Sequence, residues 1–330
     1  MASEAAGRGQ PWVTVIDQAS GAVRARFLAY ESSFRGGVRL AVGDLDGDGI
    51  ADVATAPGPG RPGEIRVFRQ DGVELLRYRT LPFGPAYRSG VELAVGDVTG
   101  DARLDLVAAA SRGAGEVRVF AITPTAADPV ANLAIRAFTA FPRTTIGGAS
   151  VATADIGTFS GGIVVDAERR DGRMEIVVGS GAGIAPLVVI YDVSAAPVVI
   201  RRLRPLTPAV RAGLALAAGR YDNDQADDII VSAGRRGGSL VEVWSGRQTT
   251  AQPILLARQR AFAELSRLEG AIFAAGVDDN GDGRIDWLMA AEGTGGIDRG
   301  VRRIGGGPLA SSIGAALRGP LRLAVSRPRG

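Results

Sequence analysis

The chain has 330 residues, of which 46% are hydrophobic and 5% aromatic, and it contains 47 glycines but no His and no Cys. The missing residue types exclude disulfides, imidazole general bases, thiolate nucleophiles and most transition-metal sites, so hard cations with oxygen ligands are the remaining metal class. The net charge is only +3 and basic residues are not interleaved with aromatic ones, so we expect no nucleic-acid partner.

The first segment, residues 1–10, is small and polar, and we expect a disordered tail without a signal peptide. No run of about 18 apolar residues follows, so no membrane span is expected. Two alternating segments, WVTVID at 12–17 and AVRARFLAY at 22–30, predict a pair of strands joined at Gly21.

From residue 36 onward one unit recurs: a small-residue strand ending in Gly, an acidic loop, an apolar strand, a Gly-rich turn and a strand like EVRVF. The first copy begins GGVRLAVGDLDGDGIADVATAPG at 36–58, and the second begins SGVELAVGDVTGDARLDLVAAA at 89–110. The units lie near residues 36–88, 89–146, 147–211, 212–269 and 270–306, and the third carries an insertion at 156–170.

The spacing of these units predicts the fold class. The last acidic residues of the loops recur at intervals of 53 to 58 residues once the insertion is set aside, which is enough for four short strands with their turns. We therefore expect an all-β chain whose residues 11–330 form a single β-propeller of about five four-stranded blades, with six as the alternative. We expect the strands at 12–30 to complete the last blade and close the ring; alternatively, residues 308–325 supply strands of a sixth blade.

The acidic loops are the candidate metal sites. In the first loop Asp44, Asp46, Asp48 and Asp52 occupy positions 1, 3, 5 and 9, and glycines between them permit a tight turn. Alternate side chains then converge, and the backbone carbonyl of Ile50 at position 7 adds an oxygen ligand. Clustered carboxylates repel each other unless a cation compensates, and many oxygens without strict octahedral geometry favour Ca²⁺. The alternative is a set of solvated Asp-Gly turns without metal.

The other loops keep this pattern to different degrees. The fifth loop should bind nearly as well as the first, the second less well for want of a glycine after position 5, and the third, with Asp155, Asp171 and Glu175, weakly or not at all. In the fourth loop, Arg220 at position 1 is a possible replacement for the ion. The further candidate ligands are Asp97, Thr99, Asp101, Arg103 and Asp105 in the second loop, Asp222, Asp224 and Asp228 in the fourth, and Asp278, Asn280, Asp282, Arg284 and Asp286 in the fifth, with Arg103 and Arg284 acting through backbone carbonyls.

The unit resembles the FG-GAP or VCBS type of repeat found in integrin α-subunit propellers and in bacterial surface and secreted proteins. The resemblance covers roughly residues 12–293 and is strongest in DLDGDGIAD and VDDNGDGRID, although GGVRLAVGD and its variants replace the Phe-Gly start. It implies calcium between the first two strands of a blade, at the first and fifth loops. It also implies an extracellular or cell-surface protein that acts in adhesion, in ligand binding or as a scaffold.

We therefore expect a monomeric, calcium-stabilised propeller, not an enzyme, that binds a protein or glycan through loops on one face. The insertion at 156–170 is a candidate contact, and its alternative is a tolerated surface insertion. The competing hypothesis is a polysaccharide lyase or hydrolase that uses acidic residues or Tyr221 around the central channel, with the pairs Asp227–Asp228 and Asp278–Asp279 as candidates. A third possibility is a purely structural repeat within a larger surface assembly.

Overall fold

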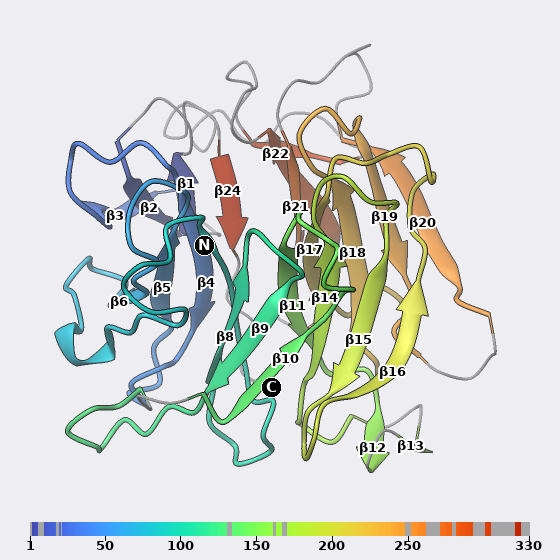
Figure 1. Ribbon diagram of the computed structural model, residues 1–330, viewed down its shortest axis with the longest axis horizontal. Helices are drawn as coiled ribbons and strands as arrows, with labels where there is room; N and C mark the ends of the chain where they lie inside the picture. The colour runs from blue at the N-terminus through green and yellow to red at the C-terminus, as the bar shows by residue number, and fades with distance from the viewer. Residues whose placement is uncertain are drawn as a thin grey trace.

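The protein is built almost entirely from antiparallel strands (Figure 1). The computed structural model describes residues 2–5, 10–17, 20, 22–130, 134–160, 163–166, 170–247, 252–261, 271–278, 282–292, 301–304 and 321–324. Within these residues the only helical element is the 3₁₀ turn η1 (Leu76–Tyr78), and none has the length and hydropathy needed to cross a bilayer.

Six sheets of three or four strands are present in the described part of the chain. The first two contain β4 (Val38–Gly43), β5 (Asp52–Pro57) and β6 (Arg66–Phe68), then β7 (Val91–Gly96), β8 (Asp105–Ala110), β9 (Glu116–Phe120) and β10 (Arg136–Thr139). The next two contain β11 (Ala149–Ala154), β14 (Glu175–Ser180), β15 (Val188–Asp192) and β16 (Val198–Leu203), then β17 (Leu214–Gly219), β18 (Asp228–Ala233), β19 (Leu240–Trp244) and β20 (Leu255–Arg260). The last two contain β21 (Ile272–Val277), β22 (Trp287–Glu292) and β23 (Val301–Arg303), then β24 (Leu321–Ala324), β1 (Ala2–Ala5), β2 (Trp12–Ile16) and β3 (Val23–Leu28).

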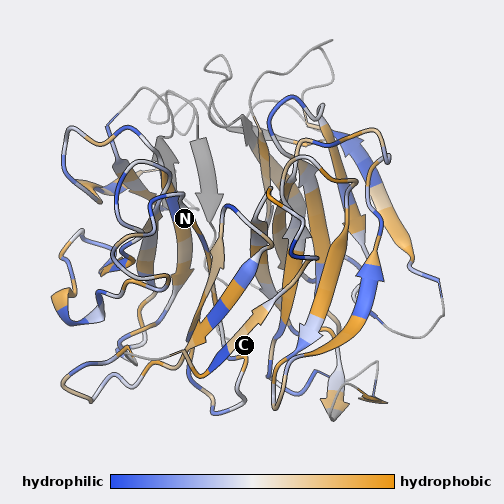
Figure 2. Cartoon of the chain, in the orientation of Figure 1, coloured by the Kyte–Doolittle hydropathy of each residue, from blue (hydrophilic) through white to orange (hydrophobic). Residues whose placement is uncertain are grey.

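The composition of each strand follows its place in the sheet. The second strands β5, β8, β14 and β18 are buried along their whole length, and their small and β-branched residues pack on both faces. The third strand β9 alternates buried and half-buried residues, whereas the outer strands β3 and β20 contain exposed and half-buried residues and no buried ones. Figure 2 shows this gradient, with hydrophobic residues on β15 and β19 and a hydrophilic stretch on the neighbouring β16.

The first strands of the sheets form a closed ring. Contacts run from β4 to β7, β11, β17, β21 and β24, and from β24 back to β4. Separate hydrophobic clusters fill the spaces between neighbouring sheets; one of them joins Leu45 and Ala54 of the first sheet to Leu93 and Leu106 of the second. The arrangement is therefore a β-propeller around a central axis, as predicted from the repeat.

The ring closes differently from our main expectation. Strands β2 and β3 do take the third and fourth places in a sheet, but they follow β1 and β24 and do not join the fifth repeat, which keeps its own strands β21 to β23. Strand β24 lies between β4 and β21 (Figure 1) and comes from the segment that we considered as the source of a sixth blade. The closing sheet combines strands from both parts of the chain, β24 with β1 to β3, so strand edges that would otherwise be exposed are paired.

Two local expectations also need correction. Part of the expected disordered tail, Ala2–Ala5, forms β1, which pairs with both β2 and β24 because it fills the second place of the closing sheet. The first sheet has three strands and not the four expected of each blade, because the segment after β6 contains the turn η1 and isolated bridges such as Ile65 with Thr80. The insertion in the third loop forms a small hairpin, β12 (Thr158–Ser160) and β13 (Ile163–Asp166).

Candidate functional site

The carboxylate at position 9 ties each of three acidic loops to its second strand. In the first loop, Asp52 Oδ2 accepts N–H bonds from Leu45 at 3.0 Å and Asp46 at 3.2 Å. Positions 2 and 3 of the second and fourth loops donate in the same way to Asp105 and Asp228. All three carboxylates are at most 1% exposed, and burial raises the pKa of Asp52 and Asp105 to about 6 and that of Asp228 to about 7. A nearby cation would favour the ionised forms.

The first loop brings three further carboxylates together. Asp44 accepts N–H bonds from Gly47 at 2.8 Å and Gly49 at 3.1 Å, and both glycines have left-handed backbones, with φ of 81° and 90°. One oxygen from each of Asp44, Asp46 and Asp48 lies within 4.8 Å of the other two. Two oxygens bound to one calcium ion at about 2.3–2.6 Å are at most about 5.2 Å apart, so this donor set fits calcium.

A cationic side chain lies beside this cluster. Arg69 follows β6 and donates to Asp46 Oδ2 at 2.9 Å, while the Asp46 side chain is 11% exposed. The pair offsets one negative charge of the loop. The sequence pattern missed this contact because Arg69 belongs to the end of the third strand, outside the repeat's acidic motif.

The fourth loop gathers a second set of three carboxylates, from Asp222, Asp224 and Asp228. Burial and the neighbouring Asp222 carboxylate raise the pKa of Asp224. In the described residues no ion pair joins Arg220 to these three carboxylates, so the pairing that we considered as an alternative to an ion is not seen there. The backbone of Arg220 instead accepts an N–H bond from Ile285 of the next sheet at 2.6 Å.

The second loop keeps the turn without the usual glycine. Asp97 accepts N–H bonds from Gly100 at 2.6 Å and Ala102 at 2.7 Å, matching Asp44 of the first loop. Ala102 has a left-handed backbone with φ of 63° at the position where the first loop has Gly49. One oxygen of the position-9 carboxylate, Asp105 Oδ1, is buried without a hydrogen-bond partner.

Replacing Ala102 with Gly should therefore stabilise the protein by about 1 kcal/mol, because an L-residue with a Cβ pays a penalty of this order in the left-handed region. Urea unfolding measures the change in the free energy of unfolding. The reverse substitution in the first loop, Gly49→Ala at φ 90°, should destabilise by a similar amount. A loss of stability in Ala102→Gly would show that the Ala side chain contributes more than its backbone costs.

The fifth loop is described only in part. Asp278 accepts the N–H of Gly283 at 2.7 Å, and Asp282 accepts the N–H of Arg284 at 2.9 Å, which is the same turn as in the first loop. Asn280 lies outside the described residues. Asp286 is exposed, unlike the buried position-9 residues of the first, second and fourth loops. Within the described chain, sets of three acidic groups close enough to share a metal occur in the first and fourth loops.

The residues expected to lend carbonyl oxygens share one backbone turn. The N–H groups of Ile50, Arg103 and Arg284 each donate to the position-5 carboxylate two residues earlier, at 2.8, 3.0 and 2.9 Å. Position 7 is therefore held close to position 5 in all three loops.

In the third loop a guanidinium does pair with a loop carboxylate, an arrangement that we had considered for the fourth loop. Arg170, at the end of the insertion, donates to the buried carboxylate of Asp155 at 3.1 Å, which also accepts the N–H of Gly172. Glu175, at position 9, accepts the N–H of Ile156 at 3.1 Å through Oε2, while its Oε1 is buried without a hydrogen-bond partner. The insertion thus supplies a positive charge where the other loops are candidates for a metal ion.

Comparison with known proteins supports the repeat assignment. Residues 44–108, which contain the first two acidic loops and the strands between them, match the FG-GAP-like repeat family. The chain is a β-propeller with FG-GAP-like repeats. No curated protein matches its sequence.

Two solved structures similar to this propeller are rhamnogalacturonan lyases. Rhamnogalacturonan lyase YesW is 13% identical with a TM-score of 0.41, and the match covers 93% of this chain and 65% of the lyase. The Bacillus licheniformis rhamnogalacturonan lyase is 12% identical with a TM-score of 0.41, and the match covers 98% of this chain and 62% of the lyase. The propeller thus spans less than two thirds of either lyase.

Backbone bonds connect neighbouring acidic loops around the FG-GAP-like propeller. In three cases the N–H at position 8 of one loop donates to the carbonyl at position 1 of the loop before it: Met174 to Asp97 at 2.6 Å, Asp227 to Asp155 at 2.8 Å and Ile285 to Arg220 at 2.6 Å. Asp227 also accepts the N–H of Asp155 at 2.9 Å through its side chain. Sequence reasoning missed these links because they depend on the angle between sheets. The Asp227 carboxylate therefore has a structural role, because it joins the third and fourth loops.

Proposed function

We propose that this protein is a calcium-binding FG-GAP-like propeller that serves as a binding or scaffold module for a protein or glycan, and that it is not an enzyme. The observation that carries the proposal is the set of three carboxylates in the first loop, Asp44, Asp46 and Asp48, whose oxygens lie within 4.8 Å of one another. The buried Asp52 holds this loop to the sheet and adds a fourth acidic group.

Calcium suits this donor set better than the alternatives. All its side-chain ligands are oxygens, and the chain offers neither imidazole nor thiolate groups that would select zinc or copper. Several oxygens of the loop already accept backbone N–H bonds, so they do not supply a full coordination shell by themselves. The loop is partly exposed, so water can supply the remaining ligands of calcium, whose coordination geometry is flexible. The fourth loop, with Asp222, Asp224 and Asp228, is the second candidate.

The role of calcium in this proposal is to order loops and not to perform chemistry. Metal binding that neutralises clustered carboxylates stabilises the folded state selectively, because the unfolded chain has no preformed site. The acidic loops and the hairpin β12–β13 follow the ends of the first strands, so ordering them would present one loop-rich face to a ligand. Together with the repeat family, this favours a role outside the cytoplasm, at the cell surface or in secreted form.

Thermal unfolding with and without calcium tests the proposal. The melting temperature in millimolar Ca²⁺ should exceed that in EGTA, and Mg²⁺ should give a smaller rise. A concentration 100 times the dissociation constant would stabilise by about 2.7 kcal/mol for one site. Asp44→Asn with Asp48→Asn keeps the side-chain carbonyl oxygens but removes two charges, and this variant should lose most of the calcium-dependent rise.

A matched control is Asp71→Asn, an exposed turn residue outside the loops that accepts the N–H of Val73 at 2.9 Å. It should keep the full calcium response. Equal melting temperatures of the unsubstituted protein in calcium and EGTA would contradict the proposal and leave the loops as metal-independent turns.

A further inference from the structure

The mouth of the central channel opposite the acidic loops contains a cavity of about 320 Å³. It is lined by the starts of the first strands of the five repeats, whereas the acidic loops follow the ends of those strands. Its size is at the lower end of the range for small-molecule sites, about 300–1,000 Å³. The cavity can therefore hold one small molecule or the terminal unit of a longer one.

At the rim of this cavity, equivalent positions of the five repeats carry different side chains. The second pairing position of each first strand carries a different residue in each repeat: Arg39, Glu92, Ser150, Ala215 and Phe273. Two residues further along, on the same face of the strand, all five repeats have Ala: Ala41, Ala94, Ala152, Ala217 and Ala275. The shared Ala shows that packing against the neighbouring blade requires a small residue at this position of every repeat. The rim position two residues earlier has no such common requirement.

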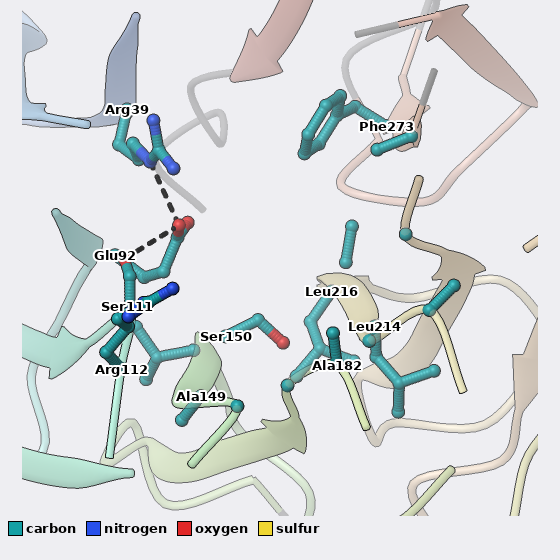
Figure 3. Close-up of a pocket in the computed structure, with 18 of the residues that line it drawn as sticks. Arg39, Glu92, Ser111, Arg112, Ala149, Ser150, Ala182, Leu214, Leu216 and Phe273 are labelled. Atoms are coloured by element: carbon teal, nitrogen blue, oxygen red, sulfur yellow. Dashed lines mark hydrogen bonds and ion pairs between the residues drawn. The ribbon is translucent and has the colours of Figure 1, made fainter. Parts of the chain in front are cut away.

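One wall of the cavity is polar. Arg39 of the first repeat reaches across to the second and donates from Nε to Glu92 Oε1 at 2.9 Å, and the Ser111 hydroxyl lies 3.2 Å from the same oxygen (Figure 3). The Arg39 and Glu92 side chains are 12% and 18% exposed. This pair is neutral as a whole and places hydrogen-bond donors and acceptors next to each other in a partly dehydrated site.

The opposite wall is apolar. Figure 3 shows Phe273 and Leu216 across the open space from Arg39 and Glu92, with Ser150 between the two walls. Phe273 and Leu216 are only half-buried, so part of their apolar surface is open to a ligand. A ligand that fills the cavity must present one edge rich in hydrogen-bonding groups and one apolar face.

We infer that this mouth binds a pyranose unit of a glycan. A pyranose has neighbouring hydroxyl groups that both donate and accept, which suits the Arg39–Glu92 pair, and a C–H face that packs on an aromatic ring such as Phe273. The inference rests on the proposed role as a binding module and names its ligand class and site. The exposed Arg112 at the rim adds a positive charge that would strengthen binding of a uronic acid.

Isothermal titration tests this inference with tetra- to hexasaccharides of glucose, xylose, mannose and galacturonic acid. At least one of these probes should bind the unsubstituted protein. Glu92→Gln, which preserves the side-chain shape, and Phe273→Ala should each weaken that binding by tenfold or more. Phe273→Leu keeps an apolar side chain and tests the ring itself should the Ala variant unfold. Leu76→Ala, an exposed apolar residue beside the first acidic loop, is the control and should bind as the unsubstituted protein does.

The outcomes separate this site from the proposed function. Glycan binding that survives both Glu92→Gln and the Phe273 variants would overturn the placement at the mouth while leaving a glycan-binding module intact. Failure of every saccharide to bind, in a protein that calcium still stabilises, would overturn the ligand class alone. Arg112→Gln should weaken binding only of the galacturonic acid probe, and equal weakening of a neutral probe would contradict a charge-based contribution of Arg112.

Discussion

Replacing Glu175 with Gln should make the protein more stable at neutral pH, by about 3 kcal/mol. Glu175 begins β14, is fully buried, and has one oxygen without a partner. Burial, and to a lesser extent the nearby Asp155 carboxylate, raises the pKa of Glu175 from 4.5 to about 9. The folded protein therefore holds a proton on Glu175 at pH 7, which the unfolded chain releases.

The pH dependence gives the sign of the effect. A carboxyl group whose pKa is raised by folding makes its full contribution to the free energy of unfolding below its ordinary pKa. This contribution is lost as the pH rises toward the pKa of the folded state. The free energy of unfolding of the unsubstituted protein should thus fall by about 1.4 kcal/mol per pH unit between about pH 4.5 and 9 through this group. Gln resembles the protonated acid in shape and does not titrate, so its variant should lack this contribution.

Urea unfolding at several pH values between 5 and 9 measures both curves. The control is Glu31→Gln, whose side chain is 50% exposed and which should follow the unsubstituted protein. Parallel curves for Glu175→Gln and the unsubstituted protein would show that Glu175 is already ionised in the folded state.

Replacing Gly181 with Ala should destabilise the protein by about 3 kcal/mol, at the upper end of the range for overpacking substitutions. Gly181 follows β14 where the chain passes the start of the third repeat, and its N–H donates to the carbonyl of Gly148 at 2.9 Å. A Cβ there would lie 1.9 Å from the carbonyl oxygen of Gly147 and 2.7 Å from that of Gly148. Both obstacles are backbone atoms, so no side-chain rotation relieves the clash.

Gly183→Ala is the matched control for this substitution. Gly183 has a left-handed backbone with φ of 99°, but a Cβ there would meet no atom within 4 Å, so the cost should be only about 1 kcal/mol. Thermal and urea unfolding compare the two variants directly. Equal losses would mean that the third sheet moves to accommodate Ala at position 181, and that close packing does not explain the glycine.

The repeat in the sequence was sufficient to predict the propeller and the first and second strands of each repeat. The pattern LAVGD, shared by RLAVGD and ELAVGD, places β4 and β7 at the same point of each unit, because a repeated hydrophobic pattern requires a repeated environment. Closure was harder to predict. The fifth repeat continues only weakly after residue 293, so the main expectation placed β2 and β3 in its sheet, and strands within residues 308–325, where β24 lies, were the alternative.

Some features of the candidate site could be predicted from the sequence and others could not. The convergence of Asp44, Asp46 and Asp48 follows from alternating positions in one turn, which sequence spacing encodes. The roles of Arg69 and Arg170 depend on where separate segments meet, and spacing does not encode that. The exposed position of Asp286 likewise shows that an intact motif does not guarantee the buried geometry seen at Asp52.

The register between β1 and β24 determines how the ring responds to mechanical load. Ala2 pairs with Ala324 and Ala5 with Leu321, so the outward-leading ends of the two strands lie at the same end of their ladder. A pulling force that enters before Ala2 and leaves after Ala324 loads one rung at a time and opens the pair like a zipper, whereas a shearing geometry would load every rung together. Under tension between its two ends, the propeller should therefore yield first at its closing sheet and at low force, before any other sheet is disturbed.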